Sequence, residues 1–226
     1  MNRFASKGIA RLVYTLVRAL ALLALKVLCR LRVEGNEHVP EQGGVLLAAN
    51  HVSYVDPVVV GCAVRRRLHY LAKEELFRRP AAGWFLRQLQ AFPISRNQAE
   101  PSVLKRTLAL LRLGEAVLVF PEGTRGDGRR LLRGKAGAGL LALRSGCPVV
   151  PIYHEGGTAV LPRGRAVPRP APVRVRIGPP LRFPPAAGEE PHRYEAVSQE
   201  IMAAIARLQA GASLAPTRVP TESPSL

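Results

Sequence analysis

A histidine and an aspartate five residues apart are the side chains best suited to proton-transfer chemistry in this sequence. They lie in residues 50–57, NHVSYVDP, directly after a short apolar run. A histidine can take a proton from an alcohol near neutral pH when a carboxylate holds its far ring nitrogen in the right tautomer. On a regular helix five residues turn through about 140°, so His51 and Asp56 can meet only across a turn. Asp56-Pro57 predicts one, because Asp suits an N-cap and Pro the first helical position.

Two interpretations of this segment remain open from the residues alone. In the first, His51 is a general base supported by Asp56 at the carboxyl end of a strand, where ligands bind in open α/β sheets. In the second, Asp56 only caps a helix and His51 is an ordinary loop residue. The chain has two aspartates, Asp56 and Asp127, so composition alone would place one five residues after a histidine in about 4% of such chains.

A second segment, FPEGTRG at 120–126, also follows an apolar run and suits anion binding. Gly123 lets backbone amides approach an anion, and Thr124 offers a hydroxyl. Arg125 can bind phosphate through its bidentate guanidinium. A strand-end loop with these residues predicts a phosphate site. An exposed turn with a solvated Arg125 is the alternative.

Together the two segments resemble the motifs of the glycerolipid acyltransferases, typified by 1-acylglycerol-3-phosphate acyltransferase. Residues 50–56 match the first family motif and residues 120–125 the third. The second and fourth motifs resemble FPISR at 92–96 and VPI at 150–152, and KAGA at 135–138 resembles a Lys-x-Gly-Ala that often begins a helix. The resemblance covers about residues 30–180.

The resemblance implies an O-acyltransferase that moves a fatty acyl group from acyl-CoA or acyl-carrier protein to the free hydroxyl of a lysophospholipid such as 1-acylglycerol 3-phosphate. It implies His51 as general base and Asp56 as its support, with no acyl-enzyme, metal or other cofactor. The implied acceptor-binding residues are Arg96, Glu122, Gly123, Thr124, Arg125 and Lys135, with Pro151 in the pocket wall. Ser95 and Gly126 depart from the family pattern, so another lysolipid or a lyso-aminolipid stays open as acceptor.

Strands and helices alternate along the part of the chain that carries these residues. Short apolar runs predict strands at 45–49, 68–72, 91–94, 116–120, 148–153 and 173–177. Helical patterns occupy 102–113, 135–144 and 189–208, and a further helix is expected to start near Asp56. This alternation predicts a single α/β domain over residues 31–209, with a mostly parallel or mixed sheet flanked by helices. Residues 210–226, rich in Ala, Ser, Pro and Thr, predict a disordered tail.

Residues 1–30 contain a strongly apolar helical segment, IARLVYTLVRALALLALKVL at 9–28. On a helical wheel the basic side chains fall within roughly 80° of one another: Arg3, Lys7, Arg11 and Arg18. The leucines 16, 20 and 23 lie away from them. This pattern predicts an amphipathic helix on an anionic membrane surface. A core helix with a solvated basic side and a membrane-spanning helix are the alternatives.

The charge balance limits the classes of partner. Lysines and arginines number 33 against 16 acidic residues, a formal net charge of +17. Such a charge attracts polyanions, so a non-catalytic protein that binds nucleic acid or anionic lipid is the alternative function. No nucleic-acid-binding motif accompanies the arginines, so we expect an anionic membrane surface as partner, and no nucleic acid. The scattered Cys29, Cys62 and Cys147 predict no disulfide or zinc site but a reducing compartment, hence the cytoplasmic face of the cell membrane.

Two other segments stand out less. His154-Glu155 at the end of a predicted strand is interpreted as an ordinary polar pair. Trp84-Phe85-Leu86, flanked by arginines, fits either an interfacial patch that admits acyl chains or core packing.

Overall fold

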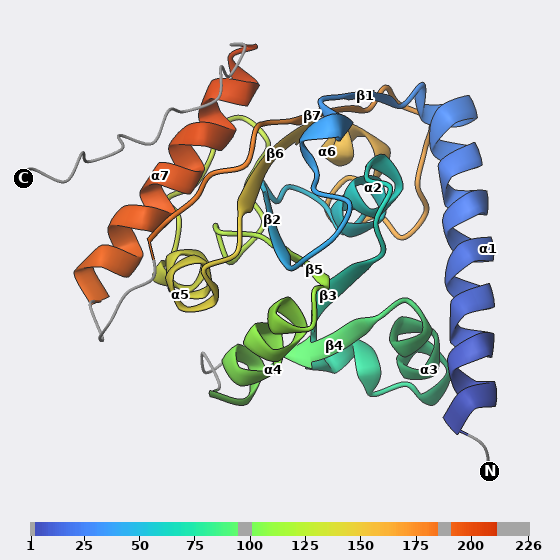
Figure 1. Ribbon diagram of the computed structural model, residues 1–226. Coiled ribbons are helices and arrows are strands. Elements are labelled where there is room, and N and C mark those ends of the chain that lie inside the picture. The colour runs from blue at the N-terminus through green and yellow to red at the C-terminus, as the bar shows by residue number, and fades with distance from the viewer. Residues whose placement is uncertain (1–2, 95–100, 185–190, 212–226) are drawn as a thin grey trace, which may run out of the picture.

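The computed structural model describes residues 3–94, 101–184 and 191–211, which form one seven-stranded sheet covered by helices (Figure 1). The strand order is β1-β7-β6-β2-β5-β3-β4. The strands are β1 Arg32–Glu34, β2 Val45–Ala49, β3 Leu68–Lys73, β4 Ala91–Ile94, β5 Ala116–Val119, β6 Val149–Glu155 and β7 Arg174–Ile177. Every pair is parallel except β6 with β7. The predicted α/β fold with a mostly parallel or mixed sheet is confirmed.

Helices cover both faces of the sheet. They are α1 Arg3–Cys29, α2 Asp56–Ala63, α3 Pro80–Gln88, α4 Pro101–Arg112, α5 Ala136–Ser145, α6 Gly157–Val160 and α7 Pro191–Gln209, with short 3-10 turns at Asn36–His38 and Glu74–Phe77. In Figure 1, α5 and α7 lie on one side of the sheet and α1, α2 and α3 on the other.

The central strand β2 explains why its sequence is a continuous apolar run. Val45, Leu47 and Ala49 pack in a core with α1 and α2, and Leu46 and Ala48 pack in a second core with α4, α5 and α7. Successive side chains of a strand point to opposite faces, so a sheet covered on both faces needs an apolar residue at every position.

All six predicted strands are present, whereas three short elements were missed. β1 has three residues with one apolar side chain, and α6 has four residues, so neither carries a periodic pattern that sequence can reveal. α3 contains Trp84 and Phe85, which are 52% and 40% exposed and are therefore not core residues. Most of the predicted tail, residues 212–226, lies outside the described residues; α7 ends at Gln209, before it.

Helix α1 lies along the domain with one side covered. Tyr14, Leu25 and Cys29 are buried, while a row of large apolar side chains is exposed: Leu12, Leu16, Leu20, Leu23, Val27 and Leu28. Within the described residues one helical stretch, Arg11–Cys29, is long and apolar enough to cross a membrane, and 17% of its apolar window is buried. A helix so little buried is not the core helix of the alternative interpretation.

Arg18 does not belong to an exposed basic stripe, contrary to expectation. Its guanidinium donates to the carbonyl oxygens of Gly61 (Nε, 3.0 Å) and Val64 (Nη2, 2.6 Å) at the carboxyl end of α2. A cation there satisfies carbonyl groups that have no partner within the helix. Arg18 therefore joins α1 to α2, and the exposed leucines face away from this contact.

Candidate active site

The site lies where the carboxyl ends of three neighbouring parallel strands meet. β2 lies between β5 and β6, with Ala49 opposite Ile152 of β6. Just after β2, Asn50 is joined to His154 of β6 by three hydrogen bonds: Asn50 Nδ2 donates to the His154 carbonyl (3.0 Å), the His154 amide donates to Asn50 Oδ1 (2.8 Å), and His154 Nε2 lies 2.8 Å from the Asn50 carbonyl. These bonds continue the ladder by one residue, and the chain then turns sharply into the loop that carries His51.

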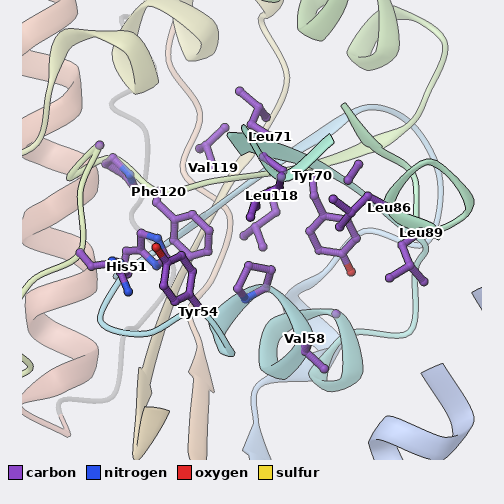
Figure 2. Close-up of a pocket in the computed structure, with 18 of the residues that line it drawn as sticks. His51, Tyr54, Val58, Tyr70, Leu71, Leu86, Leu89, Leu118, Val119 and Phe120 are labelled. Atoms are coloured by element: carbon purple, nitrogen blue, oxygen red, sulfur yellow. The ribbon is translucent and has the colours of Figure 1, made fainter. Parts of the chain in front are cut away.

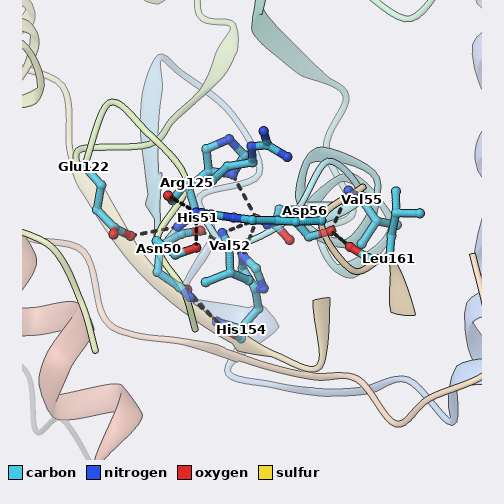
Figure 3. Close-up of polar contacts among 12 residues, drawn as sticks. Asn50, His51, Val52, Val55, Asp56, Glu122, Arg125, His154 and Leu161 are labelled. Atoms are coloured by element: carbon cyan, nitrogen blue, oxygen red, sulfur yellow. Dashed lines mark hydrogen bonds and ion pairs between the residues drawn. The ribbon is translucent and has the colours of Figure 1, made fainter. Parts of the chain in front are cut away.

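His51 and Asp56 lie together across this loop. His51 Nδ1 is 2.9 Å from Asp56 Oδ2, and the same oxygen accepts the amides of Val52 (2.6 Å) and Ser53 (2.7 Å) (Figure 3). A carboxylate that already accepts two amides can only accept from the ring, so Nδ1 carries the proton, and in the neutral imidazole Nε2 is then the nitrogen with the lone pair.

Asp56 has a different local role from the predicted cap. The cap position of α2 is Val55, and Asp56 is the first helical residue. Its fully buried carboxylate turns back onto the preceding loop rather than onto the helix. Pro57, next in the helix, is compatible with this start because its missing N–H is not needed there.

The His51 ring faces a cavity. It stacks on Phe120, with ring centroids 4.0 Å apart and planes at 17°, and its side chain is 19% exposed. Phe120 lies just after β5, next to β2, so the stack fixes the plane of the imidazole from the neighbouring strand end. In Figure 2 both rings lie at one end of a cavity of about 1050 Å³.

The cavity has a basic end and an apolar end. The cations Arg125, Lys135 and Arg163 line the cavity beside His51, because the loop of residues 120–126 bonds to the His51 carbonyl, to the Lys135 amide and to the Arg163 guanidinium. In Figure 2 the cavity continues from His51 past Leu118 to Leu86 and Leu89. Among the described residues that line it, none is acidic. A pocket lined in this way suits a molecule with an anionic head and an apolar chain.

Arg125 and Lys135 are held by specific neighbours. The Arg125 guanidinium carbon lies 3.6 Å from the centre of the Tyr54 ring, a cation–π contact. Gly123 has a φ of +64°, which favours glycine in this turn, and the Lys135 side chain lies close against it: an added Cβ would fall 2.8 Å from Cδ of Lys135. Thr124 is exposed and also lines the cavity.

Glu122 does not face the cavity, contrary to its predicted place among the acceptor-binding residues. Its carboxylate is buried and accepts the backbone amides of His51 (Oε1, 2.8 Å) and Leu132 (Oε2, 3.1 Å). Burial raises the pKa of Glu122, although both amide bonds lower it. The amide of Gly126 donates to the His51 carbonyl at 2.7 Å. The FPEGTRG loop at 120–126 therefore bonds to both the amide and the carbonyl of His51.

Two other expected residues are not part of the described cavity. Pro151 is buried within β6, opposite Ala48 of β2, and is not among the lining residues that the structure describes. Arg96 lies outside the described residues.

Sequence reasoning missed two contributors, Arg163 and His154. Arg163 lines the cavity and donates to the carbonyls of Arg125 and Gly126. His154 is fully buried, with Nε2 2.8 Å from the Asn50 carbonyl and 3.8 Å from Asp56 Oδ2. Burial lowers the pKa of His154, although the nearby Asp56 raises it. A histidine two residues after the VPI motif was the available signal, and its strand-end position led to the interpretation as an ordinary polar pair.

Proteins of known name resemble this chain along most of its length. The sequence model of the family described as Acyltransferase matches residues 30–155. A 1-acyl-sn-glycerol-3-phosphate acyltransferase of Bacillus subtilis is 34% identical over 163 residues, 70% of this chain and 79% of that protein. One of Pseudomonas aeruginosa is 32% identical over 189 residues, 80% of this chain and 72% of that protein. The crystal structure of a 1-acyl-sn-glycerophosphate acyltransferase of Thermotoga maritima matches with a TM-score of 0.72 at 25% identity, covering 91% of this chain and 83% of that one.

Proposed function

Because the chain belongs to the acyltransferase family, we propose that it acylates the free hydroxyl of 1-acylglycerol 3-phosphate, the acceptor for which its relatives are named. The donor is a fatty acyl thioester of CoA or of acyl-carrier protein, and the products are phosphatidic acid and a free thiol. Family membership makes the chain an enzyme and removes the non-catalytic alternative.

In the proposed reaction His51 is the general base. With its Nδ1–H held by Asp56, Nε2 takes the proton of the acceptor hydroxyl as the oxygen attacks the thioester carbonyl. A carbon–oxygen bond forms, the carbon–sulfur bond breaks, and the proton passes from His51 to the departing thiolate. Asp56 stabilises the imidazolium that exists between these two proton transfers.

The basic end of the cavity is proposed to hold the acceptor phosphate. Arg125 and Arg163 offer guanidinium groups and Lys135 an ammonium group beside His51. Arginine binds phosphate through paired N–H donors, and lysine contributes a point charge. Arg96 stays an expected member of this set. Binding of the phosphate positions the acceptor hydroxyl near Nε2, so these cations also influence the rate.

The apolar end of the cavity is proposed to hold an acyl chain. The exposed side of α1 is proposed to lie on the membrane from which the lipid substrate comes. Leu86, Leu89 and Leu118 line that end. The exposed leucines of α1 provide an apolar face suited to the bilayer interface. The cysteines are free thiols, which fits the proposed location at the cytoplasmic face of the cell membrane.

The observation that carries the proposal is the 2.9 Å contact of His51 Nδ1 with Asp56 Oδ2, on a ring that lines a cavity with cations and apolar side chains. The test is thiol release from palmitoyl-CoA in anionic vesicles, with and without lysophosphatidic acid. We expect release that requires the acceptor in the wild type and disappears in His51→Ala. Undiminished release from His51→Ala would refute the proposed base.

The matched control is His192→Ala, which makes the same side-chain change at an exposed position on α7. It should retain wild-type release. Parallel reactions with lysophosphatidylcholine and a lyso-aminolipid in place of lysophosphatidic acid test the acceptor. Equal rates with these lipids would contradict phosphate recognition, because neither presents a terminal phosphate monoester to Arg125 and Lys135.

A further inference from the structure

We infer that residues 161–173, named here the arginine segment, form a second contact with an anionic bilayer, beside the cavity that α1 also lines. The segment joins α6 to β7 and reads LPRGRAVPRPAPV, with three arginines, four prolines and no acidic residue. This inference rests on the proposed function, because it describes how a lipid-binding cavity meets its membrane.

The middle of the arginine segment is exposed without interruption. Residues 163–170 are all exposed, and Val167 at their centre is 76% exposed. Arg165 and Arg169 flank this valine. An exposed apolar side chain between cations suits a headgroup region, where the cations meet lipid phosphates and the apolar group enters the boundary of the acyl chains.

The segment is nevertheless held in a defined shape. Near its start, Arg163 Nη2 donates to the carbonyls of Arg125 (2.6 Å) and Gly126 (2.9 Å), which belong to the FPEGTRG loop at 120–126. At its end, the amide of Val173 donates to the carbonyl of Cys29 (2.9 Å), the last residue of α1. The arginine segment is therefore attached at one end to the candidate active site and at the other to the helix with the exposed leucines.

The cavity wall connects these two surfaces. Tyr14, Val17 and Ala21 of α1 line it, as do Arg163 and Gly164 of the arginine segment. Two further lining residues, Tyr54 and Val58, are themselves exposed. With α1 and the arginine segment both on a bilayer, a lipid would pass between membrane and cavity without crossing water.

Charge and apolarity together favour a lipid surface over a protein partner. An acidic carrier protein would use the arginines but would gain little from an exposed valine or from the leucines of α1. An anionic bilayer uses both, since cations attract it and apolar side chains enter it.

A tryptophan probe tests the contact without any need for turnover. Trp84 is the only tryptophan. Replacing it in Trp84→Phe removes the native tryptophan fluorescence, so the emission of Val167→Trp in the same full chain comes from position 167 alone. We expect Val167→Trp emission to shift to the blue and to be quenched by brominated lipid in phosphatidylglycerol vesicles that contain no substrate. Unchanged emission in protein that co-sediments with these vesicles would overturn the inference. A change caused by acyl-carrier protein and not by vesicles would overturn it in favour of a protein partner.

A matched pair of double variants measures the contribution to binding. Arg165→Gln with Val167→Ser removes one cation and one apolar group from the segment. Arg112→Gln with Leu113→Ser does the same at the end of α4, next to Gly43 and Gly114 near the amino ends of β2 and β5. Leu113 is 77% exposed, like Val167. We expect about a tenfold weaker vesicle partition for the first variant and about wild-type partition for the second. Equal partition of the two variants would contradict the inference, whether or not the protein transfers acyl groups.

Discussion

The backbone of Gly157 lies directly against the carboxylate of Asp56. A Cβ added at Gly157 would fall 2.5 Å from Asp56 Oδ1, the oxygen that finds no hydrogen-bond partner among the described residues. The positive φ at this corner, +94°, belongs to Gly156 and not to Gly157. The close approach to Asp56, rather than backbone conformation, therefore demands glycine at position 157.

Gly157→Ala should lower kcat by at least about tenfold, because the added methyl group must displace Asp56 or the start of α6 and so misplace the base. Steady-state kinetics with a thermal melt of each protein will measure this. Gly8→Ala, where a Cβ would meet nothing within 4 Å, is the matched control and should leave kcat unchanged. A fully active Gly157→Ala enzyme would show that Asp56 tolerates displacement.

Asp56→Asn should reduce kcat strongly, by up to about 10⁴-fold by analogy with hydrolytic triads. An amide can donate to Nδ1 of His51, which favours the tautomer with its proton on Nε2 and removes the base. The measurement is the single-turnover rate at saturating acceptor, with circular dichroism to check folding. A rate within tenfold of wild type would mean that the tautomer of His51 does not depend on Asp56.

Tyr54→Leu should raise the acceptor KM by a few-fold to about thirtyfold, since a cation–π contact contributes about 0.5–2 kcal/mol to holding the Arg125 guanidinium. The smaller effect should be on kcat. Tyr54→Phe keeps the ring and should behave like the wild type. If the Phe and Leu variants have the same acceptor KM, the ring does not position Arg125.

The stability of the protein should fall as pH drops below about 6.5, in part because of His154. Its pKa is lowered from 6.5 by burial, so between the folded and unfolded pKa values the unfolded chain binds a proton that the folded chain does not. The free energy of unfolding then decreases with falling pH by up to about 1.4 kcal/mol per pH unit for this one group.

Urea unfolding of the wild type and His154→Gln between pH 5 and pH 8 will measure this slope. The variant should show a shallower slope, because Gln does not titrate. His69, whose pKa is also lowered by burial, contributes equally in both proteins and cancels in the comparison. Parallel slopes would show that His154 is not forced to stay neutral in the folded protein.

Local patterns in the sequence were sufficient for the main elements and for the two chemical segments. The apolar run at 45–49 predicts β2 because a strand buried on both faces leaves no polar position. His51 and Asp56 could be paired from sequence because they are five residues apart and Asp56-Pro57 marks a turn. Interactions of this range depend on a few neighbouring residues, so the sequence alone carries them.

Only the tertiary structure decided the direction of side chains whose hydrogen-bond partners are distant in the sequence. Arg18 reaches Gly61, which is 43 residues away in the chain, and Glu122 reaches the amide of His51 across 71 residues. A helical wheel or a motif shows that these residues are basic or acidic, but it does not specify which group forms a hydrogen bond with each side chain. Their direction follows from the order of the strands and from the need to pair buried charges, which exist only once the sheet has assembled.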